Sequence, residues 1–146
     1  MSPESVFEIK TNADFNKTAL NVATGNVNIA SGGIISSAAT IDTDGGDHTI
    51  TAAELISGFT YIGSGTGNSD VLTFPSAGGV QTQLVSIGIT SAAGMKMPTV
   101  YATANSSHSL DIQDSTSTSI GTVAAGEGAA IEFLFTSANT AVIILH

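Results

Sequence analysis

Residues 131–145 read Ile-Glu-Phe-Leu-Phe-Thr-Ser-Ala-Asn-Thr-Ala-Val-Ile-Ile-Leu, and this stretch decides the fold class. Side chains alternate between the two faces of a strand, so Ile131, Phe133 and Phe135 are expected on one face. The small polar residues Ser137 to Thr140 are typical of a turn. The stretch therefore predicts a closing β-hairpin, which carries two of the six Phe residues and is expected to hold the centre of the core.

Upstream of this hairpin, short apolar segments recur that are bounded by Gly, Ser, Asn, Asp or Pro. They are Phe59–Ile62, Val71–Phe74, Leu84–Ile89, Thr99–Ala102, Leu110–Ile112 and Ile120–Val123. Such spacing and turn chemistry are typical of an all-β domain. We expect an antiparallel β-sandwich or jelly roll.

One short helix is expected, from about Ala52 to Ser57. Thr51 can cap its first turn while Glu54, three residues later, completes a capping box. Gly58 supplies the stop. A helix of barely two turns closes one end of a sheet structure and does not form a layer.

The N-terminal third differs from this body, which we place at residues 50–146. Residues 1–18 mix charges without a clean period and are expected to form an extended arm. Residues 19–49 contain short apolar pairs separated by glycines, followed by the loop Asp42–His48. With few large side chains, this segment is expected to pair with the body or with a neighbouring subunit.

Charge is scarce in this chain: 10% of residues are charged, against about 25% in ordinary soluble domains. The formal net charge is −9, and Lys10, Lys17 and Lys96 are the only cations besides histidine. Nucleic acid and anionic membrane surfaces would repel such a protein. There is no Cys, so neither disulfides nor thiolate metal sites are expected, which fits assembly in a reducing cytosol.

Two further sequence features bear on localisation. Glu4 and Glu8 stand where a signal peptide would have a basic stretch, so no export signal is expected. The longest strongly apolar run, Ala141–Leu145, is far shorter than the roughly 20 residues of a membrane helix. We expect a soluble protein.

The loop Asp42–His48 places Asp42, Asp44 and Asp47 within six residues of one another, beside His48. Hard cations such as calcium favour oxygen-rich loops, although the spacing is not that of an EF-hand. Gly and Asp are also ordinary turn formers. We expect no metal site and keep calcium binding as the alternative.

Neither nucleotide binding nor catalysis has a supporting motif. The run Gly63-Ser-Gly-Thr-Gly67 lacks the Lys-Ser or Lys-Thr of a phosphate loop, so we interpret it as a hairpin loop. No Gly-x-Ser-x-Gly elbow occurs, and a triad would need His48, His108 or His146 without local support. We expect no catalytic residues, no cofactor and no enzymatic activity.

The loop Met95-Lys-Met-Pro98 is unusually apolar for this chain. Methionine side chains adapt to irregular surfaces. Burial beneath the loop and contact with a partner are both compatible with the pattern, and neither is favoured.

Two runs carry a family resemblance: Ile50-Thr-Ala-Ala-Glu-Leu-Ile-Ser-Gly58 and Asp70-Val-Leu-Thr-Phe-Pro-Ser-Ala77. Followed by Thr-, Ser- and Gly-rich strands, they resemble small virion surface proteins of tailed bacteriophages and other large DNA viruses. The resemblance covers residues 50–146. It implies a β-sandwich or jelly-roll capsid decoration (cement) protein, usually a homotrimer, that docks where major capsid protein subunits meet.

The sequence therefore leads us to expect a viral structural protein on the capsid exterior, assembled in the host cytoplasm. The alternative is a fibre or a receptor- or carbohydrate-binding head of a virion, because residues 20–29 resemble the short repeats of phage fibres. Sugar binding needs exposed aromatic platforms, for which Tyr61 and Tyr101 are the candidates.

Overall fold

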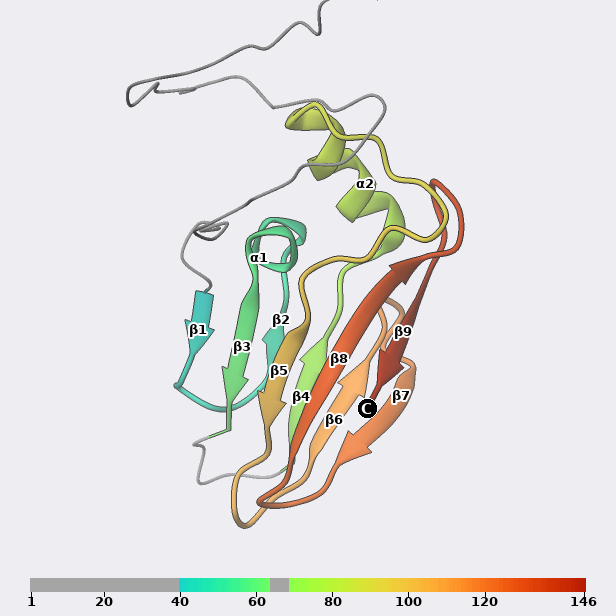
Figure 1. The fold of residues 1–146 in the computed structure, drawn as a ribbon. Coiled ribbons are helices and arrows are strands. Elements are labelled where there is room, and N and C mark those ends of the chain that lie inside the picture. The colour runs from blue at the N-terminus through green and yellow to red at the C-terminus, as the bar shows by residue number, and fades with distance from the viewer. Residues whose placement is uncertain (1–39, 64–68) are drawn as a thin grey trace, which may run out of the picture. The chain divides into compact units, whose positions relative to one another are not determined.

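In the part of the chain that the structure describes, strands outnumber helices and build two stacked sheets. The computed structural model describes residues 40–63 and 69–146, in which the sheets form a sandwich with two short helices at one end (Figure 1). The elements are β1 (Thr40–Asp42), β2 (His48–Thr49), α1 (Ala52–Ser57), β3 (Phe59–Ile62), β4 (Asp70–Thr73), α2 (Ala77–Ser86), β5 (Val100–Thr103), β6 (Leu110–Gln113), β7 (Ser119–Val123), β8 (Gly128–Phe135) and β9 (Ala141–Leu145).

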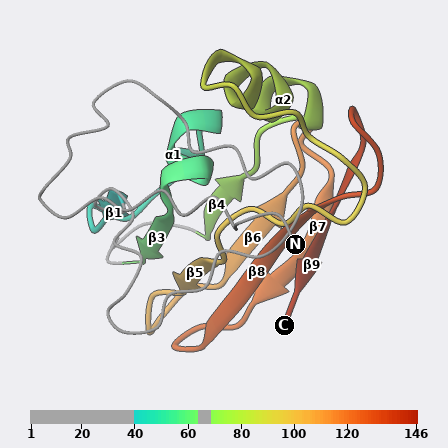
Figure 2. The same ribbon diagram turned by 45° about the horizontal axis from the view of Figure 1, so that its top comes forward.

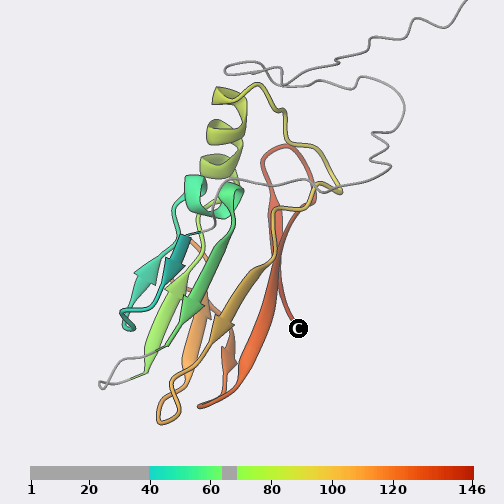
Figure 3. The same cartoon turned by 60° about the vertical axis from the view of Figure 1, so that its left-hand side comes forward.

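The expected sandwich is confirmed, but its sheets are mixed and not purely antiparallel. The five-stranded sheet has the order β1-β3-β5-β8-β9, and the four-stranded sheet has the order β2-β4-β6-β7. From β1 to β6, successive strands alternate between the two sheets. Each time the chain returns to a sheet, its new strand therefore runs in the same direction as the previous strand of that sheet. β1, β3 and β5 are therefore parallel, as are β2, β4 and β6. Only the pairings that involve β7, β8 and β9 are antiparallel. Figure 3 shows the two sheets as layers.

The first helix, α1, has the predicted bounds and the predicted cap. The Thr51 hydroxyl accepts a hydrogen bond from the backbone N–H of Glu54, and the Glu54 carboxylate accepts one from the backbone N–H of Thr51. Gly58 follows with a φ of 100°, which glycine adopts without strain. These signals lie within eight residues, which is why the sequence was sufficient to find them.

A second helix, α2, replaces the strand predicted over Leu84–Ile89, and the prediction of a single helix is wrong. Ser76 caps it by accepting from the N–H of Gly79, and Val80 and Leu84 bury one face. The helix ends in a Schellman arrangement, in which Ile89 N–H donates to the Leu84 carbonyl. Two glycines in its first turn weaken the helical signal. Figure 2 brings forward the end of the sandwich where α1 and α2 lie.

The predicted C-terminal hairpin is confirmed. β8 pairs with β9 in the register Phe133 with Ile143, and Ile131, Phe133 and Phe135 are buried. The core extends beyond this hairpin, because side chains from both sheets and both helices join it. Its largest fully buried members include Tyr61, Phe59, Phe74, Phe133, Phe135 and Ile50.

The predicted arm, residues 1–18, and most of the segment 19–49 lie outside the described residues. The described part of that segment pairs with the body, since β1 lies along β3 and β2 lies along β4. The loop prediction for Asp42–His48 holds for its middle, whereas its two end residues belong to strands.

Candidate functional site

The acidic loop of the sequence is held by hydrogen bonds within the chain. Oδ2 of Asp42 lies 2.8 Å from Nδ1 of His48, and Oδ1 of Asp42 accepts from the backbone N–H of Asp44 at 3.0 Å. Asp47 turns away to accept from the backbone N–H of Val71 at 3.0 Å. Two of the three carboxylates thus serve different structural partners.

His48 connects this loop to α1. Its imidazole stacks on Phe59 with ring centroids 4.8 Å apart, and its Nε2 lies 3.6 Å from Oε2 of Glu54. That separation suits an ion pair with the protonated ring but is too long for a hydrogen bond. Burial alone would raise the pKa of Glu54. Hydrogen bonds from Thr51 and the electrostatic attraction of the nearby imidazole together lower it by more, so the pKa of Glu54 lies below its usual value.

Tyr61 and Asp70 form the buried part of the same corner. The Tyr61 hydroxyl lies 2.7 Å from the carbonyl oxygen of Gly46 and 3.0 Å from Oδ2 of Asp70. Burial, together with the Asp70 carboxylate, raises the pKa of Tyr61 far above its ordinary value. Tyr61 thereby ties the loop to the start of β4.

These contacts make the corner a structural cluster. Among residues 40–63 and 69–146, no three His, Asp or Glu side chains are placed to hold a metal ion together. The other two histidines named above lie in different surroundings: Nε2 of His146 contacts Glu132 at 3.3 Å, and the backbone N–H of His108 donates to Asn105.

The hairpin predicted at the glycine run 63–67 is wrong, because the flanking strands β3 and β4 belong to different sheets and do not pair. Residues 64–68 lie outside the described part of the chain. At Gly63, a Cβ atom would stand 2.7 Å from the backbone nitrogen of Asn105, so only glycine allows this close backbone approach.

The loop Met95–Pro98 is packed against the fold, which favours burial of its methionines. Met97 is buried, and its N–H donates to the Phe133 carbonyl at 3.0 Å. The N–H of Phe135 donates to the Met95 carbonyl at 2.9 Å. The loop thus continues the line of β5 along β8 and places Lys96 opposite Leu134.

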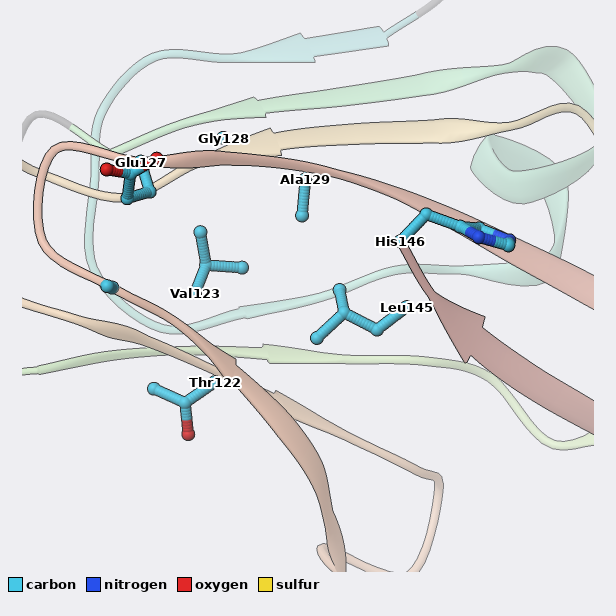
Figure 4. A pocket seen from close by; sticks show the side chains of 8 residues that line it. Thr122, Val123, Glu127, Gly128, Ala129, Leu145 and His146 are labelled. Carbon is cyan, nitrogen blue, oxygen red and sulfur yellow. The ribbon is translucent and has the colours of Figure 1, made fainter.

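A small pocket of about 330 Å³ lies between the ends of β7, β8 and β9 (Figure 4). The side chains of Val123 and Leu145 lie centrally among the labelled residues, and Glu127 and His146 lie toward opposite sides. Thr122, Glu127 and His146 add polar groups to a lining of small and aliphatic side chains, so the pocket is mixed in character.

One exposed apolar surface of the described residues is a sheet face. We call the outward side of the five-stranded sheet the outer face. It comprises Ile41 on β1, Thr60 and Ile62 on β3, Tyr101 and Thr103 on β5, Glu132 and Leu134 on β8, and Val142 and Ile144 on β9. The exposed fractions are 60% for Ile41, 59% for Tyr101, 43% for Val142 and 41% for Ile62. Exposed apolar patches occur at surfaces that bind proteins or ligands, which makes the outer face a candidate site.

Charge on the outer face is confined to one balanced group. Nζ of Lys96 lies 3.0 Å from Oε1 of Glu132, and His146 approaches the other carboxylate oxygen. Hydrogen bonds from Lys96 and from His146 hold the pKa of Glu132 below its usual value. The carboxylate is thus neutralised within the face.

The outer face was not foreseen from the sequence, although a signal was present. β9 is apolar at every position, and such a strand is typical of sheets that are covered on both sides. Two tyrosines were candidates for sugar platforms. The prediction for Tyr61 is wrong because its side chain is fully buried, whereas Tyr101 is exposed on the outer face.

Comparisons of the chain with protein-family models, with curated proteins and with solved structures find no match. Within the described residues, neither helix has the length and apolar character needed to cross a membrane.

Proposed function

We propose that the chain is a viral structural protein, namely a capsid decoration (cement) protein. It binds the outside of an assembled capsid and stabilises the contacts between major capsid protein subunits. It acts without catalysis, as a homotrimer on the capsid exterior, after assembly in the host cytoplasm.

The observation that carries this proposal is the outer face. Exposed Ile41, Ile62, Tyr101 and Val142 lie on one side of a single sheet, with only the Lys96 and Glu132 pair and His146 adding charge. Aromatic and aliphatic residues with few charges are typical of the centre of a protein contact. A protein built around such a surface is suited to assembly.

The proposed mechanism is mass action. A subunit that binds only the assembled shell stabilises the shell by its free energy of binding. Residues 1–18 are proposed to be the arm that becomes ordered on the capsid. The entropic cost of that ordering makes binding depend on the right geometry.

The test is co-sedimentation of the full chain with shells assembled from the major capsid protein of the same virus. We expect saturable binding to expanded shells and a higher temperature of shell rupture. Deletion of residues 1–18 should weaken binding while the far-ultraviolet circular dichroism of the body stays unchanged. Absence of binding by the full chain would reject the proposal.

A fibre or carbohydrate-binding head is the second candidate, favoured by one observation. Tyr101 is 59% exposed on the outer face, where an aromatic ring can support a sugar. Binding on a glycan array that Tyr101→Ala abolishes would favour this candidate over decoration.

A further inference from the structure

We infer that Asp44 is a site of spontaneous covalent modification, at which its side chain closes a succinimide ring with the backbone nitrogen of Gly45 and reopens as isoaspartate. The inference goes beyond the proposed function and does not depend on it. It is carried by the order of the two residues in the sequence and by the exposure of the loop. It is also carried by hydrogen bonds that engage the two neighbouring carboxylates.

The reaction is an intramolecular condensation followed by hydrolysis, and water is its only other participant. The nitrogen of Gly45 attacks Cγ of Asp44, a bond forms between these two atoms, and the bond from Cγ to its hydroxyl oxygen breaks. The hydroxyl and the amide proton leave together as water. Water then adds to the imide. Cleavage between the nitrogen and Cγ restores aspartate, whereas cleavage between the nitrogen and the main-chain carbonyl carbon leaves isoaspartate, in which the main chain runs through Cγ.

The residue after the aspartate decides how easily the ring closes. A Cβ atom there crowds the approaching nitrogen, and glycine has none. Asp44 is the only aspartate of the sequence that glycine follows. Gly45 and Gly46 have φ values of 68° and 99°, and glycine adopts positive and negative φ with similar ease, so this segment can reach the geometry of attack. The N–H of Gly45 donates to none of the described residues, so no contact has to break first.

The three carboxylates of the loop differ in what holds them. The carboxylate of Asp42 lies 2.8 Å from Nδ1 of His48 and accepts from the backbone N–H of Asp44 at 3.0 Å. The carboxylate of Asp47 accepts from the backbone of β4 at 3.0 Å. The carboxylate of Asp44 has no hydrogen-bond or ionic partner in the part of the chain that the structure describes, and the residue is exposed. Its Cγ can therefore turn toward Gly45 without giving up a contact.

Isoaspartate lengthens the main chain of a loop that is tied on both sides. On one side the Asp42 carboxylate contacts His48, and on the other the Gly46 carbonyl accepts from the Tyr61 hydroxyl at 2.7 Å. The extra methylene between residues 44 and 45 changes the span between these ties. The number of carboxyl groups stays the same, because the displaced main-chain carboxyl replaces the side-chain one. We therefore expect the isoaspartate form to unfold at a lower temperature than the unmodified chain.

Peptide mapping of the full chain by mass spectrometry, after incubation at about pH 5, measures the modification. Mildly acidic buffer is used because an aspartyl carboxyl must carry its proton to release an oxygen as water. We expect an imide lighter by one water, followed by isoaspartate, which isoaspartyl methyltransferase labels. Isoaspartate should form at Asp44 at least about tenfold faster than at Asp47, because the residue after Asp47 carries a Cβ. Similar rates at the two residues, or no modification of Asp44, would overturn the inference.

The unfolded chain separates the contribution of the sequence from that of the structure. In concentrated urea the Asp44-Gly45 pair is unconstrained, so the rate there is the reference. Because the folded loop leaves both reacting groups unengaged, the folded chain should react within about tenfold of this rate, which corresponds to about 1.4 kcal/mol of activation free energy. Modification in urea without modification of the folded chain would overturn the inference, since the folded loop would then protect the site.

Two variants of the same residue identify the ring. Asp44→Glu keeps the charge and the following glycine but needs a six-membered ring, as the natural pair Glu127-Gly128 does, so it should stay unmodified. Asp44→Asn closes the same five-membered ring with ammonia leaving in place of water, so it should yield aspartate and isoaspartate at neutral pH. Methyltransferase labelling of aged Asp44→Glu equal to that of the unaltered chain would overturn the assignment to Asp44.

Thermal unfolding of the aged chain gives the structural readout. We expect a second transition at lower temperature, with an amplitude that follows the isoaspartate content at Asp44. Asp44→Glu aged in parallel is the matched control and should keep a single transition. A single unchanged transition of the aged chain at high isoaspartate content would overturn the expected effect on the loop.

Discussion

The hydroxyl of Tyr61 lies 3.0 Å from Oδ2 of Asp70, and this contact joins the two sheets at the corner where β3 and β4 lie. Tyr61 is fully buried and Asp70 is 6% exposed. Water therefore cannot easily replace either partner. The same hydroxyl holds the carbonyl of Gly46, so one oxygen atom connects the loop, the core and the start of β4.

Tyr61→Phe should reduce the free energy of unfolding by about 1–3 kcal/mol, because it removes the one hydroxyl proton that the carbonyl of Gly46 and the buried Asp70 carboxylate share. Tyr101→Phe is the matched control and should leave stability nearly unchanged, because Tyr101 is exposed. Chemical denaturation of the two variants measures both values. Equal stability of Tyr61→Phe and the unaltered chain would show that the contact contributes nothing.

Glu54 should make the helix cap sensitive to acid. Burial raises its pKa, but hydrogen bonds from Thr51 and the nearby His48 bring the folded value below the unfolded value of 4.5. A lowered folded pKa adds stability above the unfolded pKa, and this stability is lost as pH falls through the folded pKa. The stability difference between the unaltered chain and Glu54→Gln should therefore be largest above about pH 5 and shrink toward about pH 3. A difference that stayed constant over this interval would contradict the assignment.

Replacing a glycine within α2 and a glycine just after its end with alanine should change the stability of the protein in opposite directions. Gly78 lies inside the helix with no atom within 4 Å of an added Cβ, so Gly78→Ala should stabilise by about 0.5 kcal/mol. Gly88 has a φ of +82°, so Gly88→Ala should destabilise by about 1 kcal/mol. Thermal unfolding should move up for the first and down for the second. A shift of both in one direction would contradict the assigned helix end.

Gly63→Ala should destabilise the sandwich by about 1–3 kcal/mol, the range for an overpacked site. The new Cβ would stand 2.7 Å from the nitrogen of Asn105 and 2.9 Å from the oxygen of Thr103, and neither backbone atom can move as a flexible side chain does. Gly78→Ala serves as the control for the chemical change. Unchanged unfolding of Gly63→Ala would mean that the approach of β3 to residues 103–105 is looser than described.

Calcium should leave the melting temperature unchanged at about 5 mM, a concentration that saturates even weak extracellular calcium sites. Asp42 is paired with His48, and Asp47 holds the backbone of Val71, so both carboxylates would have to leave existing partners. Differential scanning fluorimetry measures the shift. A rise that Asp44→Asn removed would instead establish the calcium alternative for this loop.

Local signals account for what was predicted correctly. The capping box at Thr51 and Glu54 and the alternation of Ile131, Phe133 and Phe135 each lie within a few residues of sequence. α2 was missed because Gly78 and Gly79 conceal a helix whose stability comes from burying Val80 and Leu84. Packing against the fold overrides weak local propensity there.

The candidate surface could not be predicted in the same way. The members of the outer face lie on five strands that are spread from Ile41 to Ile144. β1, β3 and β5 come together by parallel pairing after the chain has visited the other sheet, and β8 and β9 join them by antiparallel pairing. The composition indicated a surface poor in charge. Only the strand topology brings the exposed apolar side chains together on the outer face.

By itself, the sequence determined the scarcity of charge, the capped helix α1 and the C-terminal hairpin, because composition and neighbouring residues suffice for each. The tertiary structure alone decided the mixed sheets, the contact of Tyr61 with Asp70 and the pairing of Lys96 with Glu132. These last two contacts join residues that lie 9 and 36 positions apart in the chain. Such contacts form only when strand order and register bring their elements together, and no local pattern encodes that order.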